Sequence, residues 1–350
     1  MKTMEITDIK SLNKDELTDF IKEIGEPAFR AAQLYEWMHV KMARDYDRMG
    51  NVPKSLKQKL SEKCEYTSLR IARMQESKLD GTRKYLFELS DGQYVESVFM
   101  RYKHGNSVCI SSQVGCRMGC RFCASTLDGL SRNLKPSEML DQIYAISTDT
   151  GERVSNVVVM GTGEPLDNYD NLVKFIDLLT NKDGLNISQR NITVSTCGLV
   201  PKIYELADLE LAITLALSLH AVTDEKRREL MPIANTYSIA ELMDACGYYF
   251  EKTGRRISFE YALVRDVNDT SQDAVLLSKL AGPLGCHVNL IPVNPIKERS
   301  YDRSLGKDVL AFKNKLEKNG INVTIRRELG SDIDGACGQL RRRVQSEGAD

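Results

Sequence analysis

The chain has 350 residues, with 48 lysines and arginines against 49 aspartates and glutamates, so its formal net charge is −1. Hydrophobic residues make up 42% and charged residues 28%, which excludes collagenous and disordered chains and fits a globular protein of one or two domains. No apolar run approaches the roughly 18 residues of a membrane-spanning helix, and the charged N-terminal residues do not resemble a secretory signal. We therefore expect a cytoplasmic protein with no membrane association, whose nine cysteines serve some purpose other than structural disulfides.

A net charge near zero argues against a uniformly basic nucleic-acid-binding protein, but affinity for phosphate groups depends on where the cations lie. Short clusters of lysine and arginine occur at residues 226–228, 255–256, 326–327 and 341–343. The solvated end of a helix or strand explains such a cluster as readily as an RNA-binding surface does. Charge alone therefore leaves the class of partner open.

Apolar residues recur at helical spacing in three segments near the N-terminus. The first segment begins after a candidate helix cap at Asn13 or Asp15. The second covers residues 28–42, and the third covers residues 55–63. No strand pattern occurs before Tyr85. We expect residues 1–80 to form a compact helical domain.

The hydrophobic period changes from helical to alternating near residue 84. Residues 84–89, an Asp91-Gly92 turn and residues 94–100 predict a β-hairpin, because Asp-Gly is favoured in two-residue hairpin turns. This pattern places a connector at residues 81–104.

Short apolar strands and helices alternate along the rest of the chain. Strands are predicted at residues 107–111, 156–160, 191–195, 212–218, 257–264, 287–293 and 321–327. Helices are predicted at residues 136–148, 168–179, 200–206, 239–252, 271–280 and 305–319. Strict alternation predicts right-handed βαβ units and a parallel sheet, and six repeats favour a partial (β/α)6 barrel. The expected fold class is α/β, with the barrel at residues 105–350 and a small helical N-terminal domain.

Three cysteines follow the first predicted barrel strand in a Cys-x3-Cys-x2-Cys pattern: Cys116, Cys120 and Cys123. Thiolates are the preferred ligands of iron–sulfur clusters and of zinc. A structural zinc site wants four protein ligands, and no second Cys-x2-Cys pair is present. Three ligands leave one iron of a cubane cluster open to an external molecule, so the pattern favours a reactive cluster.

The wider sequence around this loop is distinctive. Residues 109–116 read Cys-Ile-Ser-Ser-Gln-Val-Gly-Cys, and residues 332–340 read Asp-Ile-Asp-Gly-Ala-Cys-Gly-Gln-Leu. With the Cys-x3-Cys-x-Phe-Cys loop, these strings resemble the RlmN/Cfr family of radical S-adenosylmethionine (SAM) RNA adenosine methyltransferases. The resemblance runs from about residue 14 onward. It implies a radical SAM barrel, one [4Fe-4S] cluster on the three cysteines, and SAM as cofactor, with two molecules used per turnover.

Polar residues also occur where the later strands end. Their positions resemble those that contact SAM in the family: Gly163, Glu164, Ser195, Ser218, Leu219, His220 and Asn294. Glu164 would receive the ammonium group of SAM, and the glycine before it would allow close backbone approach. Taken singly, the Gly-rich turn is also consistent with a structural loop, Ser195 or Asn294 with an ordinary turn residue, and His220 with a hydrogen-bonded loop histidine.

Two further cysteines match the family's catalytic pair. The resemblance implies that Cys337 accepts a methyl group and presents it to the RNA, and that Cys109 then resolves the product, leaving a transient disulfide. Thiols suit this chemistry, because carbon 2 of adenine is electrophilic and cannot itself attack the methyl group of SAM, whereas a thiolate can. The remaining cysteines are expected in the core: Cys64, Cys197, Cys246 and Cys286.

Glu96, on the predicted hairpin, matches the family residue that acts as the base. An exposed strand carboxylate is the alternative interpretation.

The resemblance implies methylation of carbon 2 of adenine 2503 in 23S ribosomal RNA and of adenine 37 in tRNA. The partners implied are these RNAs, an electron donor such as flavodoxin or ferredoxin, and a thiol reductant for the Cys109–Cys337 disulfide. The helical N-terminal domain resembles the family's accessory domain, for which an RNA-binding role is expected. Two alternatives remain open, namely Cfr-type methylation of carbon 8, which gives antibiotic resistance, and a non-catalytic metal-dependent RNA-binding protein.

Overall fold

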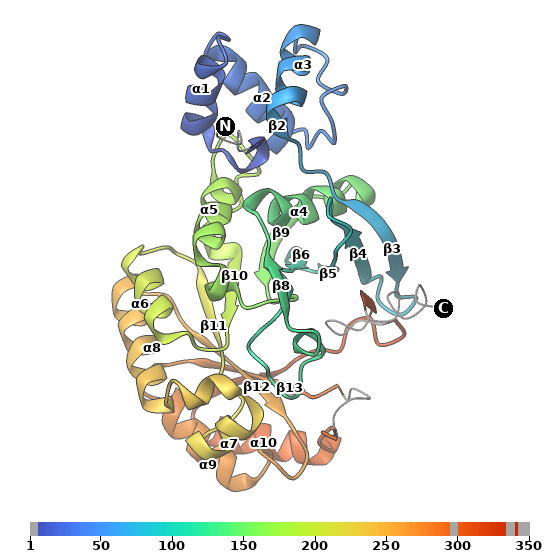
Figure 1. Ribbon diagram of the computed structural model, residues 1–350. Coiled ribbons are helices and arrows are strands. Elements are labelled where there is room, and N and C mark those ends of the chain that lie inside the picture. The colour runs from blue at the N-terminus through green and yellow to red at the C-terminus, as the bar shows by residue number, and fades with distance from the viewer. Residues whose placement is uncertain (1–5, 295–299, 334–339, 342–350) are drawn as a thin grey trace.

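The computed structural model of the chain describes residues 6–294, 300–333 and 340–341. A helical unit formed by the N-terminal residues lies at one end of the molecule, beside a ten-stranded sheet with its covering helices (Figure 1). The strands of this sheet follow the order β14-β13-β12-β11-β10-β9-β6-β5-β4-β3. No helix in the described ranges is long and apolar enough to cross a membrane.

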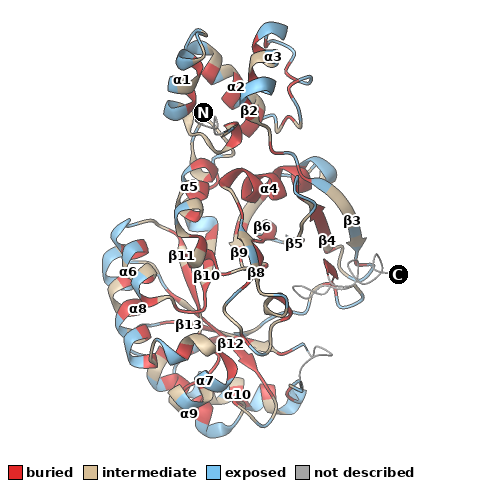
Figure 2. Ribbon diagram, in the orientation of Figure 1, coloured by how far each residue is buried: buried red, intermediate tan, exposed pale blue. Residues whose placement is uncertain are grey.

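Seven neighbouring strands of the sheet run parallel. They are β6 (Gly105–Ile110), β9 (Val154–Val159), β10 (Ile192–Thr196), β11 (Thr214–Ser218), β12 (Ser258–Leu263), β13 (His287–Pro292) and β14 (Asn322–Ile325). The helices between them are α4 (Pro136–Thr150), α5 (Tyr169–Thr180), α6 (Val200–Asp208), α8 (Ile239–Thr253), α9 (Ser271–Ala281) and α10 (Gly306–Lys318). The alternation predicted from the sequence is confirmed, and the fold is a partial (β/α)6 barrel. Most of its strand residues are buried (Figure 2), as expected for a parallel sheet covered by helices.

Three antiparallel strands extend the parallel sheet beyond β6. They are β3 (Arg70–Glu76), β4 (Arg83–Glu88) and β5 (Tyr94–Tyr102). The predicted hairpin is confirmed as β4–β5, but its loop covers residues 89–93 rather than two residues. The backbone N–H of Leu89 donates to Gln93 at 2.8 Å, and Gly92 takes a φ of +77° within this loop.

The three helices predicted near the N-terminus are confirmed as α1 (Lys14–Glu23), α2 (Phe29–His39) and α3 (Lys54–Lys63). Asn13, rather than Asp15, caps α1, since its side chain accepts from the N–H of Glu16 and the Glu16 carboxylate accepts from the N–H of Asn13. The expectation that no strand precedes Tyr85 was wrong. β1 (Thr7–Asp8) and β2 (Cys64–Glu65) have two residues each, and β3 is a sheet edge without a fully buried face, so none of them has an alternating apolar pattern.

Three elements near the cysteine loop were not predicted either. The loop is flanked by a short antiparallel ribbon of β7 (Gln113–Gly115) and β8 (Leu130–Asn133). Helix α7 (Asp224–Leu230) has the sequence Asp-Glu-Lys-Arg-Arg-Glu-Leu, which lacks the apolar periodicity from which an amphipathic helix is recognised.

A buried charge pair joins the N-terminal unit to α4. The ammonium of Lys10, which is 1% exposed, lies 2.8 Å from the Asp141 carboxylate and 2.6 Å from the Thr67 carbonyl oxygen. The second Asp141 oxygen accepts from the N–H of Leu69 at 2.7 Å. Because both charges are removed from water, their pairing fixes how the two parts of the chain sit against each other.

We expect Lys10→Met to lower the free energy of unfolding by about 3–5 kcal/mol, because it leaves the Asp141 carboxylate buried without its cation. Urea unfolding would measure the change. Lys14→Met is the matched control, since the Lys14–Asp183 pair has side chains 42% and 39% exposed and should contribute less than about 1 kcal/mol. Equal losses in the two variants would contradict this account.

Candidate functional site

A cavity of about 270 Å³ lies at the carboxyl ends of the parallel strands. Its walls come from the cysteine loop and from the segments that end or follow β9, β10, β11, β12, β13 and β14. Parallel barrels place their functional groups at this end, because all the strands deliver their last residues there. The cavity is therefore the candidate site.

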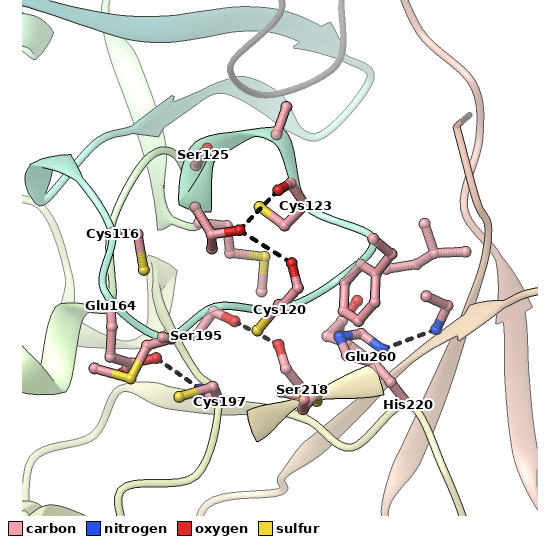
Figure 3. Close-up of a pocket in the computed structure, with 18 of the residues that line it drawn as sticks. Cys116, Cys120, Cys123, Ser125, Glu164, Ser195, Cys197, Ser218, His220 and Glu260 are labelled. Carbon is pink, nitrogen blue, oxygen red and sulfur yellow. Dashed lines mark hydrogen bonds between the residues drawn. The ribbon is translucent and has the colours of Figure 1, made fainter. Parts of the chain in front are cut away.

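The three cysteines of the loop all line this cavity (Figure 3). Thr126 holds the loop in place, since its hydroxyl donates to the carbonyl oxygens of Cys120 and Cys123 at 3.1 and 3.0 Å. At the start of the loop, the N–H of Cys116 donates to the Gly129 carbonyl at 2.8 Å. A Cβ on Gly115 would come within 2.0 Å of that same carbonyl oxygen, so only glycine fits before Cys116.

The donor set fits an iron–sulfur cluster better than a single ion. Within the described part of the chain, no three His, Cys, Asp or Glu side chains are placed to hold one metal ion. A tetrahedral zinc would draw its sulfurs to about 2.3 Å from one centre. The thiols of Cys116, Cys120 and Cys123 instead face a shared space, as ligands to the separate irons of one cluster would.

Burial strengthens the need for a metal partner at these thiols. Desolvation raises the pKa of Cys116 to about 12 and raises the pKa of Cys120 well above its usual value. Thiolates form at neutral pH in such a place only when a bound cation supplies the compensating charge.

Most residues predicted to contact SAM line the same cavity. They are Gly163, Glu164, Ser195, Ser218, His220 and Asn294. Leu219 does not; its side chain is fully buried in the hydrophobic core. The chain after β13 reaches the cavity through Asn294, and the next five residues lie outside the described ranges.

Glu164 is fixed by backbone groups. Its two carboxylate oxygens accept from the N–H groups of Leu166 and Cys197, at 3.0 and 2.7 Å, and burial raises its pKa. Gly163, with a φ of +112°, packs so closely that a Cβ there would lie 2.6 Å from the Cβ of Gln113. A larger residue would push the loop away from the cysteine segment, so this glycine is needed to bring Glu164 to the cavity.

His220 is a neutral imidazole in this site. Its Nδ1 accepts from the N–H of Ala262 at 2.9 Å, which leaves the proton on Nε2. The ring meets the edge of Phe122 at a centroid distance of 4.8 Å. Burial, with a smaller contribution from the nearby Arg227 cation, lowers the pKa of His220 to about 3.

Sequence reasoning missed some cavity residues. Cys197, expected in the core, is buried but also lines the cavity, whereas Cys64, Cys246 and Cys286 are buried away from it. Glu260 on β12 also lines the cavity, and its carboxylate accepts from Ser258 and Asn289 side chains at 2.9 and 2.8 Å. A lone carboxylate within an otherwise apolar strand was the signal that could have identified Glu260.

Glu96 and Cys109, the proposed base and resolving thiol, are not among the residues that line this cavity. Glu96 on β5 is 4% exposed, so the alternative of an exposed strand carboxylate is wrong. One of its oxygens lies 2.9 Å from the Lys84 ammonium, and the other accepts from the backbone N–H of Arg341 at 2.6 Å. Cys109 on β6 is also buried, and Cys337 lies outside the described residues.

Register places Cys109 and Lys84 on one face of the sheet. Val98 is the ladder partner of Cys109 on one side and of Lys84 on the other. Directly opposed residues of antiparallel strands share a face, and Glu96, two residues before Val98, shares it too. The structure thus brings a thiol, a carboxylate and an ammonium to one buried face.

Comparison with known proteins identifies the family. Residues 7–66 match the ribosomal RNA large subunit methyltransferase N-terminal domain, and residues 110–277 match the radical SAM superfamily. A relative from Lachnospira eligens, named probable dual-specificity RNA methyltransferase RlmN, is 67% identical over 98% of this chain and 98% of its own. The chain belongs to the RlmN family of radical SAM RNA methyltransferases. A second relative of the same name, from Lachnoclostridium phytofermentans, is 63% identical over 97% of this chain and 95% of its own.

A solved structure of a radical SAM methyltransferase is also similar to this chain over most of its length. The radical SAM methyltransferase from Sphaerobacter thermophilus has a TM-score of 0.91 and 40% identity to this chain, covering 95% of it and 98% of the other. The radical SAM match contains the whole cysteine loop. Membership of the RlmN family therefore implies a [4Fe-4S] cluster and SAM as cofactors, and the radical SAM barrel expected from the sequence is confirmed.

We expect acid to destabilise the fold partly through His220. Below about pH 6.5 the unfolded chain protonates this histidine while the folded chain does not, so the free energy of unfolding falls until about pH 3. The loss amounts to about 2 kcal/mol at pH 5. His39 is buried with a similarly lowered pKa and adds its own share.

His220→Gln should remove about half of this histidine-linked pH dependence, measured by urea unfolding at pH 7 and at pH 5. His39→Gln serves as the comparison from outside the cavity. If the free energy of unfolding of His220→Gln depended on pH as strongly as that of the unsubstituted chain, the assignment of a neutral His220 in the folded chain would be wrong.

Proposed function

We propose that this chain methylates carbon 2 of adenosine in 23S ribosomal RNA and in tRNA. The observation that carries the proposal is the convergence of three thiols and the family's SAM positions on one cavity. Relatives named as dual-specificity RNA methyltransferases, with more than 60% identity over nearly the whole chain, support the choice of substrates.

The cavity residues have distinct tasks in this proposal. Cys116, Cys120 and Cys123 would hold the cluster, which supplies the one-electron chemistry that activates SAM. Glu164, already fixed by two backbone N–H groups, retains lone pairs for the SAM ammonium. The other polar groups of the wall would orient the rest of SAM: Ser195, Ser218, His220 and Asn294. Two SAM molecules per turnover are needed, because one supplies the methyl group and the other supplies the radical chemistry.

The two thiols of the catalytic pair would act in sequence. The Cys337 thiolate would take a methyl group from SAM by displacement. The radical supplied by the second SAM would remove one hydrogen atom from that methyl group, and the resulting methylene carbon would bond to carbon 2 of the base. As the ring proton leaves to Glu96, the surplus electron would return to the cluster. The Cys109 thiolate attacks the sulfur of Cys337, breaks the bond from that sulfur to carbon, and leaves a Cys109–Cys337 disulfide. The released carbon takes a proton and becomes the new methyl group, and a thiol reductant restores both thiols.

Glu96 would accept the proton that leaves carbon 2. Its carboxylate is buried, and the Lys84 ammonium and the Arg341 N–H hold one oxygen each, so its orientation is set before RNA binds. Arg341 follows Cys337 by four residues, and its side chain also donates to Asp128 at 2.9 Å, beyond the cysteine loop. These contacts support a role for Glu96 next to the C-terminal cysteine motif.

This proposal keeps the domain roles expected from the sequence. Residues 1–80 would supply the RNA-binding accessory domain, although β3 within this range pairs with β4 in the large sheet. Residues 81–104 would form the connector, and residues 105–350 the catalytic barrel. An electron donor such as flavodoxin or ferredoxin would reduce the cluster, in the cytoplasm.

An anaerobic assay with SAM, a reductant and unmodified RNA fragments, followed by mass spectrometry of the nucleosides, tests this function. We expect 2-methyladenosine from both RNAs. 8-Methyladenosine would instead assign Cfr-type chemistry. Protein that contains zinc without iron or labile sulfide, and that methylates neither RNA, would establish the non-catalytic alternative.

Cys109→Ala should trap the chain on its RNA as a covalent adduct, because the bond from sulfur to the methylene carbon forms but is not cleaved. Denaturing gel electrophoresis with labelled RNA would detect the adduct. Cys337→Ala should keep its iron and sulfide but form neither the covalent adduct nor the methylated product.

Cys246→Ala is the control for both variants. It replaces a buried cysteine on α8 and should methylate RNA normally. Free turnover by the Cys109 variant would refute its resolving role.

Glu96→Gln should reduce methylation about 10²- to 10⁴-fold, the usual contribution of a general base, while cleavage of SAM continues. The covalent adduct should accumulate in this variant, since the proton on carbon 2 has no acceptor. Glu88→Gln changes a carboxylate at the end of the neighbouring strand and should have little effect. Equal loss of SAM cleavage and of methylation in the Glu96 variant would contradict its role as base.

A further inference from the structure

The basic cluster at residues 226–228 lies on α7, and its three cations have different surroundings. Lys226 pairs with Asp273 at 2.7 Å, and Arg228 is exposed to solvent. Arg227 is fully buried, although a solvated helix end was the simple interpretation of the sequence. An arginine is removed from water at such cost that its surroundings call for an explanation.

Backbone carbonyl groups at the edge of the cavity hold the Arg227 guanidinium. Its Nη2 donates to the Cys197 carbonyl at 2.6 Å, and its Nε donates to the Leu219 carbonyl at 3.2 Å. These carbonyls directly follow β10 and β11. The cation therefore lies beneath two neighbouring strand ends, behind the cavity-lining residues Cys197 and His220.

The charge of Arg227 lacks compensation in the described chain. No described carboxylate lies within ion-pair distance of it, and its Nη1 is buried with no hydrogen-bond partner. Asp224, a carboxylate that interacts with it electrostatically, has an oxygen engaged by the N–H of Ile239 at 2.8 Å. Arginine stays protonated even when buried, so a full positive charge is present.

The groups that Arg227 does reach belong to the cysteines of the cavity wall. Its Nη2 holds the Cys197 carbonyl, and the Cys197 side chain packs in one buried cluster with that of Cys120. Cys120 is one of the three proposed cluster ligands. A cluster held there by three thiolates carries negative charge, which would compensate the unpaired guanidinium.

We propose that Arg227 is the buried counter-charge of the iron–sulfur cluster and favours its reduced form. This proposal rests on the cluster assignment made above. Reduction adds one electron from the external donor, and so one negative charge, without breaking or forming a bond. A fixed cation nearby stabilises the more negative state more strongly and thereby raises the reduction potential. Arg227 tunes the cluster through charge and touches neither the RNA nor the reacting atoms.

Two substitutions separate charge from hydrogen bonding. Arg227→Gln removes the charge but can still donate to the Cys197 carbonyl. Arg227→Lys keeps the charge but loses the planar guanidinium that donates to two carbonyls at once. Arg228→Gln removes one exposed charge from the same helix and is the matched control. The measurement is an anaerobic redox titration of the reconstituted protein, followed by electron paramagnetic resonance of the reduced cluster.

We expect the ratio of reduced to oxidised cluster in Arg227→Gln to fall about tenfold at a fixed solution potential, which is 59 mV for a one-electron couple. Arg227→Lys and Arg228→Gln should titrate close to the unsubstituted protein. A Gln variant with an unchanged potential would overturn the proposal, as would equal shifts in all three variants. If the Gln variant does not hold a cluster, the reduction potential of Arg227→Lys tests the proposal instead. This variant keeps the positive charge, so a potential well below that of the unsubstituted protein would show that charge is not the cause.

The iron and sulfide content of the unsubstituted protein separates two failures. Absence of iron there would refute the cluster assignment itself. A normal cluster with a potential insensitive to Arg227 would refute only the counter-charge role.

Discussion

The close packing of the segment after β9 against the segment after β6 is the contact on which the site depends. The N–H groups of Ser112 and Gln113 both donate to the Thr162 carbonyl, at 2.9 and 3.1 Å. A Cβ on Gly161 would come within 2.7 Å of the Ile110 carbonyl, and one on Gly163 within 2.6 Å of Gln113. Two glycines thus let one loop lie directly on the other, and Glu164 reaches the cysteine cavity as a result.

Strand β6 connects the two groups of proposed functional residues. Its carboxyl end leads into the cysteine loop, whereas Cys109 within it lies on the same face of the sheet as the buried charges of Glu96 and Lys84. Parallel pairing with β9 on one side and antiparallel pairing with β5 on the other make this strand common to both regions. A shift in its register would move the thiol to the opposite face and displace the cysteine loop at the same time.

Much of this arrangement could be predicted from local sequence. The cysteine spacing, the alternation of strands and helices, and the polar residues at strand ends are all patterns within short segments, and they located most of the cavity. Cys197 and Arg227 could not be assigned in this way, because a cysteine after a strand and an arginine in a charged helix each have an ordinary explanation. Their roles depend on which strand ends become neighbours in space. Strand β3 was missed for a different reason, because this edge strand has no fully buried face and therefore no alternating apolar pattern.

The charge pair between Lys10 and Asp141 has a consequence for the RNA. Rotation of the N-terminal unit away from α4 would separate the Lys10 ammonium from the Asp141 carboxylate and leave both charges buried without a partner. The contact between the two parts therefore resists hinge motion. A ribosomal RNA and a tRNA differ greatly in shape, yet both would meet the same fixed frame. Under the function proposed above, each RNA would therefore have to unstack or bend its own target loop until the adenosine reaches the cavity.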